Sequence, residues 1–142
     1  VILDGKTILE VYPKITNDTI LEDIFVFCDA EMMVIEMIAS YGMSVGQSVF
    51  ETCVWIGRFE QAFGERPTEM CQIRRIYRKD VKMYLCNSMK AKDTNIRRAI
   101  LDMYPEPQIG TKKKPGPLYG VSKHAWAALA VGLTFLDVAK KQ

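Results

Sequence analysis

A single carboxylate inside an otherwise apolar segment is the strongest constraint on how this chain folds. Residues 32–38 are Met-Met-Val-Ile-Glu-Met-Ile, so apolar side chains flank Glu36 on both sides. A run of this length predicts a strand buried on both faces, as in a parallel sheet. Burying a charge there is costly unless a cation compensates it, and a bound metal ion is one such cation. The alternative is a structural residue that forms a salt bridge with Arg or Lys, or one that lies at a sheet edge.

Length and composition predict one globular domain. The 142 residues can build a sizeable core, and 49% hydrophobic with 25% charged residues is ordinary for a globular protein. No apolar run reaches the roughly 18 residues of a membrane-spanning helix, and no signal-peptide pattern opens the sequence. We therefore expect a cytoplasmic protein with no membrane partner. Its four cysteines lack CxxC spacing and are interpreted as reduced core thiols: Cys28, Cys53, Cys71 and Cys86.

The net charge of +2 conceals a strong asymmetry along the chain. Residues 1–69 carry four Lys and Arg against twelve Asp and Glu, whereas residues 70–142 carry fifteen against five. Such an imbalance suggests that the second half faces a polyanion. The alternative is a solvated surface on which the two halves neutralise each other.

The hydrophobic pattern predicts short strands alternating with helices. Strands are expected at 1–3 and 7–11, joined by an Asp4-Gly5 turn, and at 32–38 and 71–77. Helices are expected at 17–29, from a cap at Ser44 to residue 63, from Asp80 to 86, from Thr94 to 103, and from Ser122 onward. Residues 105–120 hold four of the six prolines and predict a loop. This order favours an α/β layered domain.

His124, the only histidine, is the second candidate for chemistry. It starts the last predicted helix, where its imidazole could approach the carboxylate of Glu36. Ala127 lies three residues further on the same helix face, where an acidic residue would complete a pair of ligands. Oxygen-rich sites of this kind suit magnesium or manganese. The alternative for His124 is an ordinary surface position.

Basic side chains cluster in the second half and are candidates for contacts with DNA phosphates. They surround a predicted turn between two helices and continue into the loop: Lys79, Lys82, Lys90, Lys92, Arg97, Arg98, Lys112, Lys113 and Lys114. Contacts of this type position DNA without reading its sequence. Tyr41, just beyond the Glu36 strand, is a candidate for stacking on an unpaired base. Solvated helix faces and an ordinary loop aromatic are the alternatives.

Four of these segments, in order, resemble motifs of one nuclease family. Val34-Ile35-Glu36 resembles its second acidic motif, and residues 46–57 resemble the helix that follows. Asp80-Val81-Lys82 with Lys90-Ala91-Lys92 resembles its P-x-x-V-K and G-x-G-x-A-x-K stretch. Residues 124–130 resemble its closing H-x-x-D-A-L-A. Over nearly its whole length the chain is similar to RuvC-type Holliday-junction resolvases, especially the compact forms of bacteriophages and Gram-positive bacteria.

The resemblance implies an RNase H-like fold, with a mixed central sheet flanked by helices, as a single nuclease domain over residues 1–142. It also implies a homodimer that cuts two strands of a four-way DNA junction with two divalent ions, Mg²⁺ or Mn²⁺. Matched position by position, Glu36 and His124 would bind metal, and Lys82 would lie near the scissile phosphate. The second lysine of the family matches loosely at Lys92.

Two departures from the family pattern bear on function. Ala127 stands where the closing motif has its aspartate, which predicts impaired catalysis. The chain also resembles the family from its second strand onward, so that the first central strand, with its own aspartate, is expected to be missing. We prefer this interpretation to assigning Asp4 as that aspartate, because residues on both sides of Asp4-Gly5 pair naturally as a hairpin.

The sequence therefore favours a structure-selective, metal-dependent DNA endonuclease of the resolvase class, impaired at Ala127. Its expected location is the cytoplasm of a bacterial host cell, and a phage gene is one expected source. The principal alternative is a non-catalytic protein that binds branched DNA. A third is an RNase H-like domain with a structural or RNA-processing role. The helix of residues 45–63, with Trp55 and Phe59 off its main apolar stripe, is the candidate dimer face.

Overall fold

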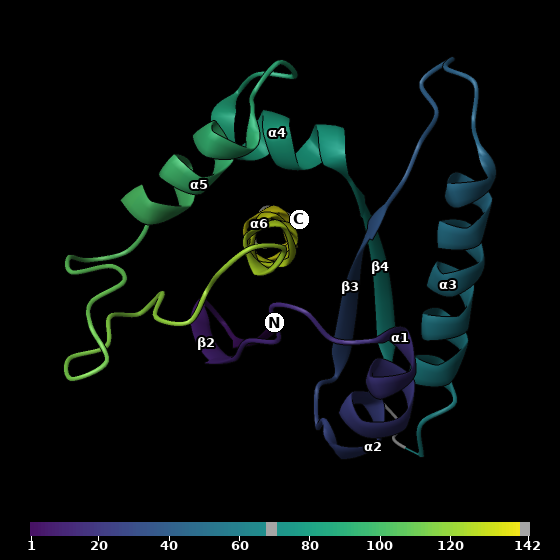
Figure 1. Cartoon of the computed structure of the whole chain (residues 1–142), viewed down its shortest axis with the longest axis horizontal. Coiled ribbons are helices and arrows are strands. Elements are labelled where there is room, and N and C mark those ends of the chain that lie inside the picture. Colours follow the sequence, from purple (N-terminus) through teal and green to yellow (C-terminus); the bar gives the residue numbers. More distant parts are fainter. Residues whose placement is uncertain (68–70, 140–142) are drawn as a thin grey trace. The chain divides into compact units, whose positions relative to one another are not determined.

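The computed structural model describes residues 1–67 and 71–139, which form helices and strands in two compact units (Figure 1). Unit 1 comprises residues 1–14 and 79–142, and unit 2 comprises residues 15–78. The predicted α/β class is confirmed in this broad sense. The described strands form two separate two-stranded sheets, where one mixed central sheet was predicted. Within the described residues, no helix is long and apolar enough to cross a membrane.

Unit 2 is built around a parallel pair of strands, β3 (Met32–Met37) and β4 (Gln72–Tyr77). The register runs from Met32 opposite Gln72 to Met37 opposite Tyr77. Both strands were predicted. The prediction that β3 is fully buried was wrong, because all six of its residues are half-buried. A sheet of two strands is narrow, and the outer edge of each strand has no strand partner among the described residues.

The helices of unit 2 lie on either side of β3 in sequence. Residues 17–27 form one helical stretch, made of α1 (Asn17–Thr19), the π-helical η1 (Ile20–Ile24) and α2 (Phe25–Phe27). The Oγ1 of Thr16 accepts a hydrogen bond from the Thr19 backbone N–H at 3.1 Å and caps its start. The long helix α3 (Gln47–Gly64) packs along β3 and β4. It begins after Gly46, so the predicted cap at Ser44 is wrong.

An aromatic cluster joins the helical stretch to α3. The ring of Phe25 meets those of Phe59 and Phe63 edge-on, with centroids 6.1 and 5.5 Å apart. Phe63 is buried, and the guanidinium of Arg66 lies 4.1 Å from its ring centroid. Arg66 also donates to the backbone oxygens of Cys28 and Ala30, so the end of α3 is fixed to the segment that enters β3.

Unit 1 contains a hairpin and three helices. The strands β1 (Ile2–Asp4) and β2 (Thr7–Glu10) pair antiparallel across a turn in which Gly5 has a φ of +54°. This confirms the predicted hairpin, since a positive φ suits glycine. The helices are α4 (Arg78–Cys86), α5 (Asp93–Asp102) and α6 (Ala125–Ala139).

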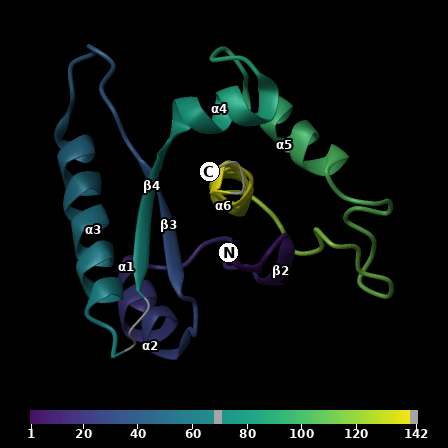
Figure 2. The same ribbon diagram turned by 180° about the vertical axis from the view of Figure 1, so that it is seen from behind.

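Helix α6 contributes more buried residues to the core of unit 1 than any other described element. Leu129 and Leu133 are completely buried, and Ile100 of α5 is buried with them. Figures 1 and 2 show α6 between the hairpin on one side and α4 and α5 on the other. Trp126 and Leu136 of the same helix are only half-buried.

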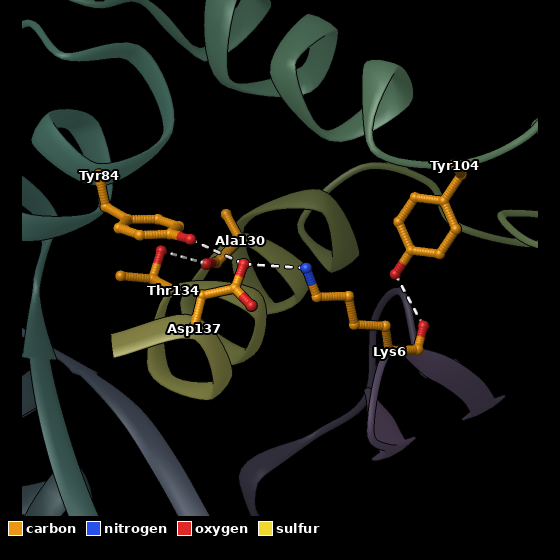
Figure 3. A network of polar contacts seen from close by, with 6 residues as sticks. All are labelled: Lys6, Tyr84, Tyr104, Ala130, Thr134 and Asp137. Atoms are coloured by element: carbon orange, nitrogen blue, oxygen red, sulfur yellow. Dashed lines mark hydrogen bonds and ion pairs between the residues drawn. The ribbon is translucent and has the colours of Figure 1, made fainter. Parts of the chain in front are cut away.

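A polar network attaches the hairpin to α6 (Figure 3). The carboxylate of Asp137 accepts hydrogen bonds from the Nζ of Lys6 at 2.9 Å and from the hydroxyl of Tyr84 at 2.7 Å. The hydroxyl of Tyr104 donates to the backbone oxygen of Lys6 at 2.8 Å. The hairpin turn is therefore bonded to Asp137 of α6 and to Tyr104 just after α5, and Tyr84 of α4 bonds to the same Asp137 carboxylate.

The predicted loop at 105–120 contains an ordered hairpin-like turn, residues 109–116, which we call the lysine hairpin. The backbone groups of Thr111 and Lys114 exchange hydrogen bonds at 2.9 and 3.1 Å, and Gly116 N–H donates to Ile109 at 2.9 Å. A Cβ at Gly110 or Gly116 would collide with backbone atoms of the same loop. The three lysines are thus displayed on a fixed backbone.

Replacing Tyr84 by Phe should make the free energy of unfolding fall less steeply as the pH rises into the alkaline range. The hydrogen bond to Asp137, followed by burial, raises the pKa of Tyr84 above its ordinary value. A raised pKa means that this contribution to stability is complete below about pH 10 and is lost as the pH rises through the folded-state pKa. Urea denaturation between about pH 9 and 11 should show a shallower decline for Tyr84→Phe than for the wild type. Parallel declines would contradict the network.

Candidate functional site

The structure gives Glu36 a cation from the protein itself. The Nε of Arg78 lies 3.7 Å from the Oε1 of Glu36, and the Glu36 side chain is 33% exposed. The expectation of a carboxylate in a dry interior is therefore wrong, and the salt-bridge alternative is confirmed. Glu36 of β3 lies opposite Ile76 of β4. Arg78 follows two residues after Ile76, directly beyond the end of β4.

His124 lies directly before α6, one residue earlier than the helix that it was predicted to start. Its side chain is exposed, and its backbone oxygen accepts from the N–H groups of Ala127 and Ala128 at 3.1 and 3.2 Å. The preceding residue, Lys123, has a φ of +47°, which is strained for a side chain of this size. Ala127 is half-buried in the first turn of the helix.

The predicted metal ligands belong to different units, Glu36 to unit 2 and His124 to unit 1. Their pairing stays a prediction. No group of three or more His, Cys, Asp or Glu side chains that could hold a metal ion occurs in the described part of the chain. One salt-bridged carboxylate, one imidazole and the methyl group of Ala127 supply too few donors for two divalent ions, each of which needs about six ligands. The residues present do not fit the two-metal site that the resemblance implies.

The basic candidates of unit 1 follow the line of α4, α5 and the loop beyond. Lys82 is half-buried on α4, and Lys79 is exposed near the start of that helix. Lys90 and Lys92 are exposed in the turn between α4 and α5. The backbone N–H of Lys92 donates to the side chain of Asn95 at 2.9 Å. This bond caps α5 in place of Thr94, the predicted cap.

Further cations continue along α5 and into the lysine hairpin. Arg97 is exposed and stacks over Trp126, with 4.8 Å to the ring centroid, whereas Arg98 pairs with Asp102 at 3.0 Å. Lys112, Lys113 and Lys114 are all exposed. We call the following set the basic track: Lys90, Lys92, Arg97, Lys112, Lys113 and Lys114.

Tyr41 belongs to unit 2, whereas the basic track belongs to unit 1. Its side chain is 55% exposed and its φ is +46°, in a turn closed by the bond from Met43 N–H to the backbone oxygen of Ser40. Its exposure is compatible with the predicted stacking on a base, which stays a prediction.

Unit 1 contains a hollow of about 580 Å³ that was not predicted from the sequence. Its walls come from residues 6–11 of the hairpin and beyond, from Met103 and Tyr104 at the end of α5, and from the loop residues Pro115, Gly116, Pro117 and Tyr119. No local pattern could reveal it, because the walls come from three segments that are distant in sequence.

The two aromatic residues singled out on the candidate dimer helix have ring contacts inside unit 2. Phe59 packs against Phe25 inside unit 2, and the ring of Trp55 lies 5.7 Å from that of Phe59. A different stripe of α3 is exposed, at the spacing of one helix face: Phe50, Cys53, Val54 and Gly57. All four cysteines are reduced thiols, as predicted, but none is buried.

Comparisons with models of protein families, with curated proteins and with solved structures found no match to this chain. Exposed lysines recur along unit 1, and cations of this kind can contact phosphate groups.

Removing either partner of the Glu36–Arg78 pair should cost little stability. Partly exposed ion pairs contribute about 1 kcal/mol or less. A double-mutant cycle of Glu36→Gln and Arg78→Gln, followed by urea denaturation, should therefore give a coupling energy of about 1 kcal/mol at most. Millimolar Mg²⁺ or Mn²⁺ should leave the stability of the wild type unchanged. Stabilisation by metal that disappears in Glu36→Gln would contradict this assignment.

Proposed function

We propose that this chain binds branched DNA, in particular four-way junctions, as an impaired member of the RuvC-type resolvases. The observation that supports binding best is the separation of charge between the two units. Unit 1 carries fourteen Lys and Arg against seven Asp and Glu, whereas unit 2 carries five against ten. Unit 1 is thus the part of the chain suited to a polyanion.

The spacing of the basic track supports contact with several phosphates. Helix α5 has ten residues and is therefore about 15 Å long. Lys90 and Lys92 lie at its start, Arg97 lies on it, and the lysine hairpin follows after its end. Phosphates along one DNA strand are spaced closely enough that each of these three groups of cations can contact a different phosphate. Such contacts favour the shape of DNA over its sequence.

The catalytic half of the proposal rests on the ordered motifs around Glu36, Lys82 and His124. We propose that these positions descend from an RNase H-like nuclease that uses Mg²⁺ or Mn²⁺, and that Ala127 removes one ligand from it. In the resolvases that the chain resembles, the metal ions activate water and stabilise the leaving oxygen. A cytoplasmic location, where junction DNA occurs, belongs to the same proposal.

A non-catalytic role in binding branched DNA is the second candidate. Two observations favour it: Ala127 has no donor atom, and Arg78 already neutralises Glu36. Phosphate binding by unit 1 needs neither residue, so both candidates predict the same interaction with DNA and differ only in cleavage.

We also propose that two copies associate through α3. The exposed stripe of Phe50, Cys53, Val54 and Gly57 would pack against itself in an antiparallel pair centred near Val54. In that arrangement, Glu51 of one protomer faces Arg58 of its partner, and the same pair recurs by symmetry. The apolar stripe and the opposite charges are therefore self-complementary.

Binding of a four-way junction should be strong at low salt and should weaken steeply as salt rises. Changing Lys90, Lys92 and Lys113 to Ala should reduce the salt slope of log K by about 2 to 3, because each phosphate contact contributes about 0.9. Fluorescence anisotropy of a labelled junction measures this slope. Arg98→Ala is the control, because Arg98 is already paired with Asp102. An unchanged slope in the triple variant would contradict the basic track.

The same junction distinguishes the two candidates by cleavage. Ala127→Asp restores a carboxylate one turn beyond His124, and nicking of the junction with Mg²⁺ or Mn²⁺ would support the impaired nuclease. Normal binding without nicking would favour the non-catalytic protein.

Val54→Asp should convert the dimer to a monomer, because it places two like charges at the centre of the proposed helix pair. Analytical ultracentrifugation measures the change in mass. Val26→Asp is the matched control, since Val26 is 66% exposed on α2, close to the 63% of Val54, and lies outside the stripe. A wild type that sediments as a monomer would reject the interface.

A further inference from the structure

The hollow of unit 1 shares a wall with the lysine hairpin. Pro115 and Gly116 line the hollow and also form the second strand of that hairpin, where Pro115 bridges to Gly110. Its volume of about 580 Å³ lies within the range of small-ligand sites, about 300–1,000 Å³. The hollow therefore adjoins the loop that carries Lys112, Lys113 and Lys114.

The lining is aromatic and apolar on two sides. Tyr104 is held in place because its hydroxyl donates to the backbone oxygen of Lys6, as Figure 3 shows. Tyr119 is 44% exposed, and its N–H donates to Gly116 at 3.0 Å. Leu9, at 58% exposure, contributes from β2. Flat, partly exposed rings of this kind accept the face of a base.

Positive charges lie beside one wall of the hollow, and a carboxylate lies in another wall. Lys114 directly precedes the wall residue Pro115, with Lys112 and Lys113 on the same turn. The amine of Lys6 is engaged by Asp137. Glu10 also lines the hollow, and it accepts a hydrogen bond from the hydroxyl of Tyr12. A ligand that fits this pattern places an anion at the lysine hairpin and hydrogen-bond donors towards Glu10.

We propose that the hollow binds one unpaired nucleobase of a DNA strand, stacked on Tyr119, while the neighbouring phosphates contact Lys112, Lys113 and Lys114. This inference rests on the proposed DNA-binding function and adds a site for a base that has left the duplex. Paired bases do not expose their faces, so only an unstacked nucleotide can enter a concave aromatic site. Branched DNA supplies such nucleotides where strands exchange.

An extended peptide along the edge of β2 is less compatible with the structure. Tyr104 already occupies the backbone oxygen of Lys6 beside that edge. Three adjacent lysines also favour a polyanion over an apolar strand.

The test uses the full chain and a single strand of about 12 thymidines with one central 2-aminopurine, whose fluorescence is quenched by stacking. The wild type should bind the strand and quench the probe more strongly than in the same strand annealed to its complement. Tyr119→Leu should lose the additional quenching and bind about 5-fold more weakly or worse. Tyr119→Phe keeps the ring and should retain both.

A second variant tests the phosphate contacts separately. Replacing Lys112, Lys113 and Lys114 by Ala should lower the salt slope for the single strand by about 2, at about 0.7 per contact. Quenching at saturation should persist, because the aromatic wall is intact.

The outcomes separate this inference from the proposed function. If the junction is bound but Tyr119→Leu quenches and binds like the wild type, the nucleobase site is rejected and DNA binding stands. If the junction is not bound even at low salt, both are rejected. Binding of an extended apolar peptide that is lost in Tyr119→Leu, with no effect of that change on the oligonucleotide, would assign the hollow to a peptide instead.

Discussion

The carboxylate of Asp137 links three segments of unit 1 that are distant in sequence. It bonds to Lys6 in the hairpin and to Tyr84 in α4, and thereby joins segments that are 131 and 53 residues away in sequence. An isolated two-stranded hairpin is marginally stable in water, so the hairpin depends on this attachment and on its apolar contact with α6. Since residues 6–11 form one wall of the hollow, the same carboxylate also determines the geometry of the proposed nucleobase site.

Binding and catalysis make different demands on the chain, and the described residues meet them unequally. Phosphate contacts require exposed cations on a stable backbone, which the basic track and the glycine-constrained lysine hairpin provide. Metal-assisted hydrolysis requires several donors arranged around each ion. Arg78 satisfies the charge of Glu36, and Ala127 offers no donor at all. The proposed contacts with DNA therefore need none of the groups that the proposed metal chemistry lacks.

Much of the secondary structure was predictable because it depends on local patterns. The apolar run around Glu36 indicated β3, and the spacing of Ile96 and Ile100 indicated α5. Helix starts were predicted less well, because capping depends on backbone angles that the sequence does not display. Gly46, with extended geometry, caps α3, and the side chain of Asn95 returns to the backbone of Lys92.

The features that the sequence did not reveal depend on register and on distant segments. Arg78 reaches Glu36 only because β3 and β4 run parallel, with Glu36 opposite Ile76. The exposed stripe of α3 depends on a contact between distant segments, because Phe25 packs against Phe59 and so covers a different face of the helix. The lysine-bearing segment was predicted only as a loop, whereas the structure shows backbone hydrogen bonds between Thr111 and Lys114 within it.

The discontinuity of unit 1 dictates an order of events during translation. Residues 15–78 form a unit that is continuous in sequence, so all of its segments are made one after another. The first fourteen residues cannot reach their final partners at that time, since Asp137 is made 131 residues after Lys6. At about 5–20 residues per second, the newborn hairpin waits roughly 7 to 26 seconds for its anchor. During that interval, its strand edges are open to chaperones and to other nascent chains.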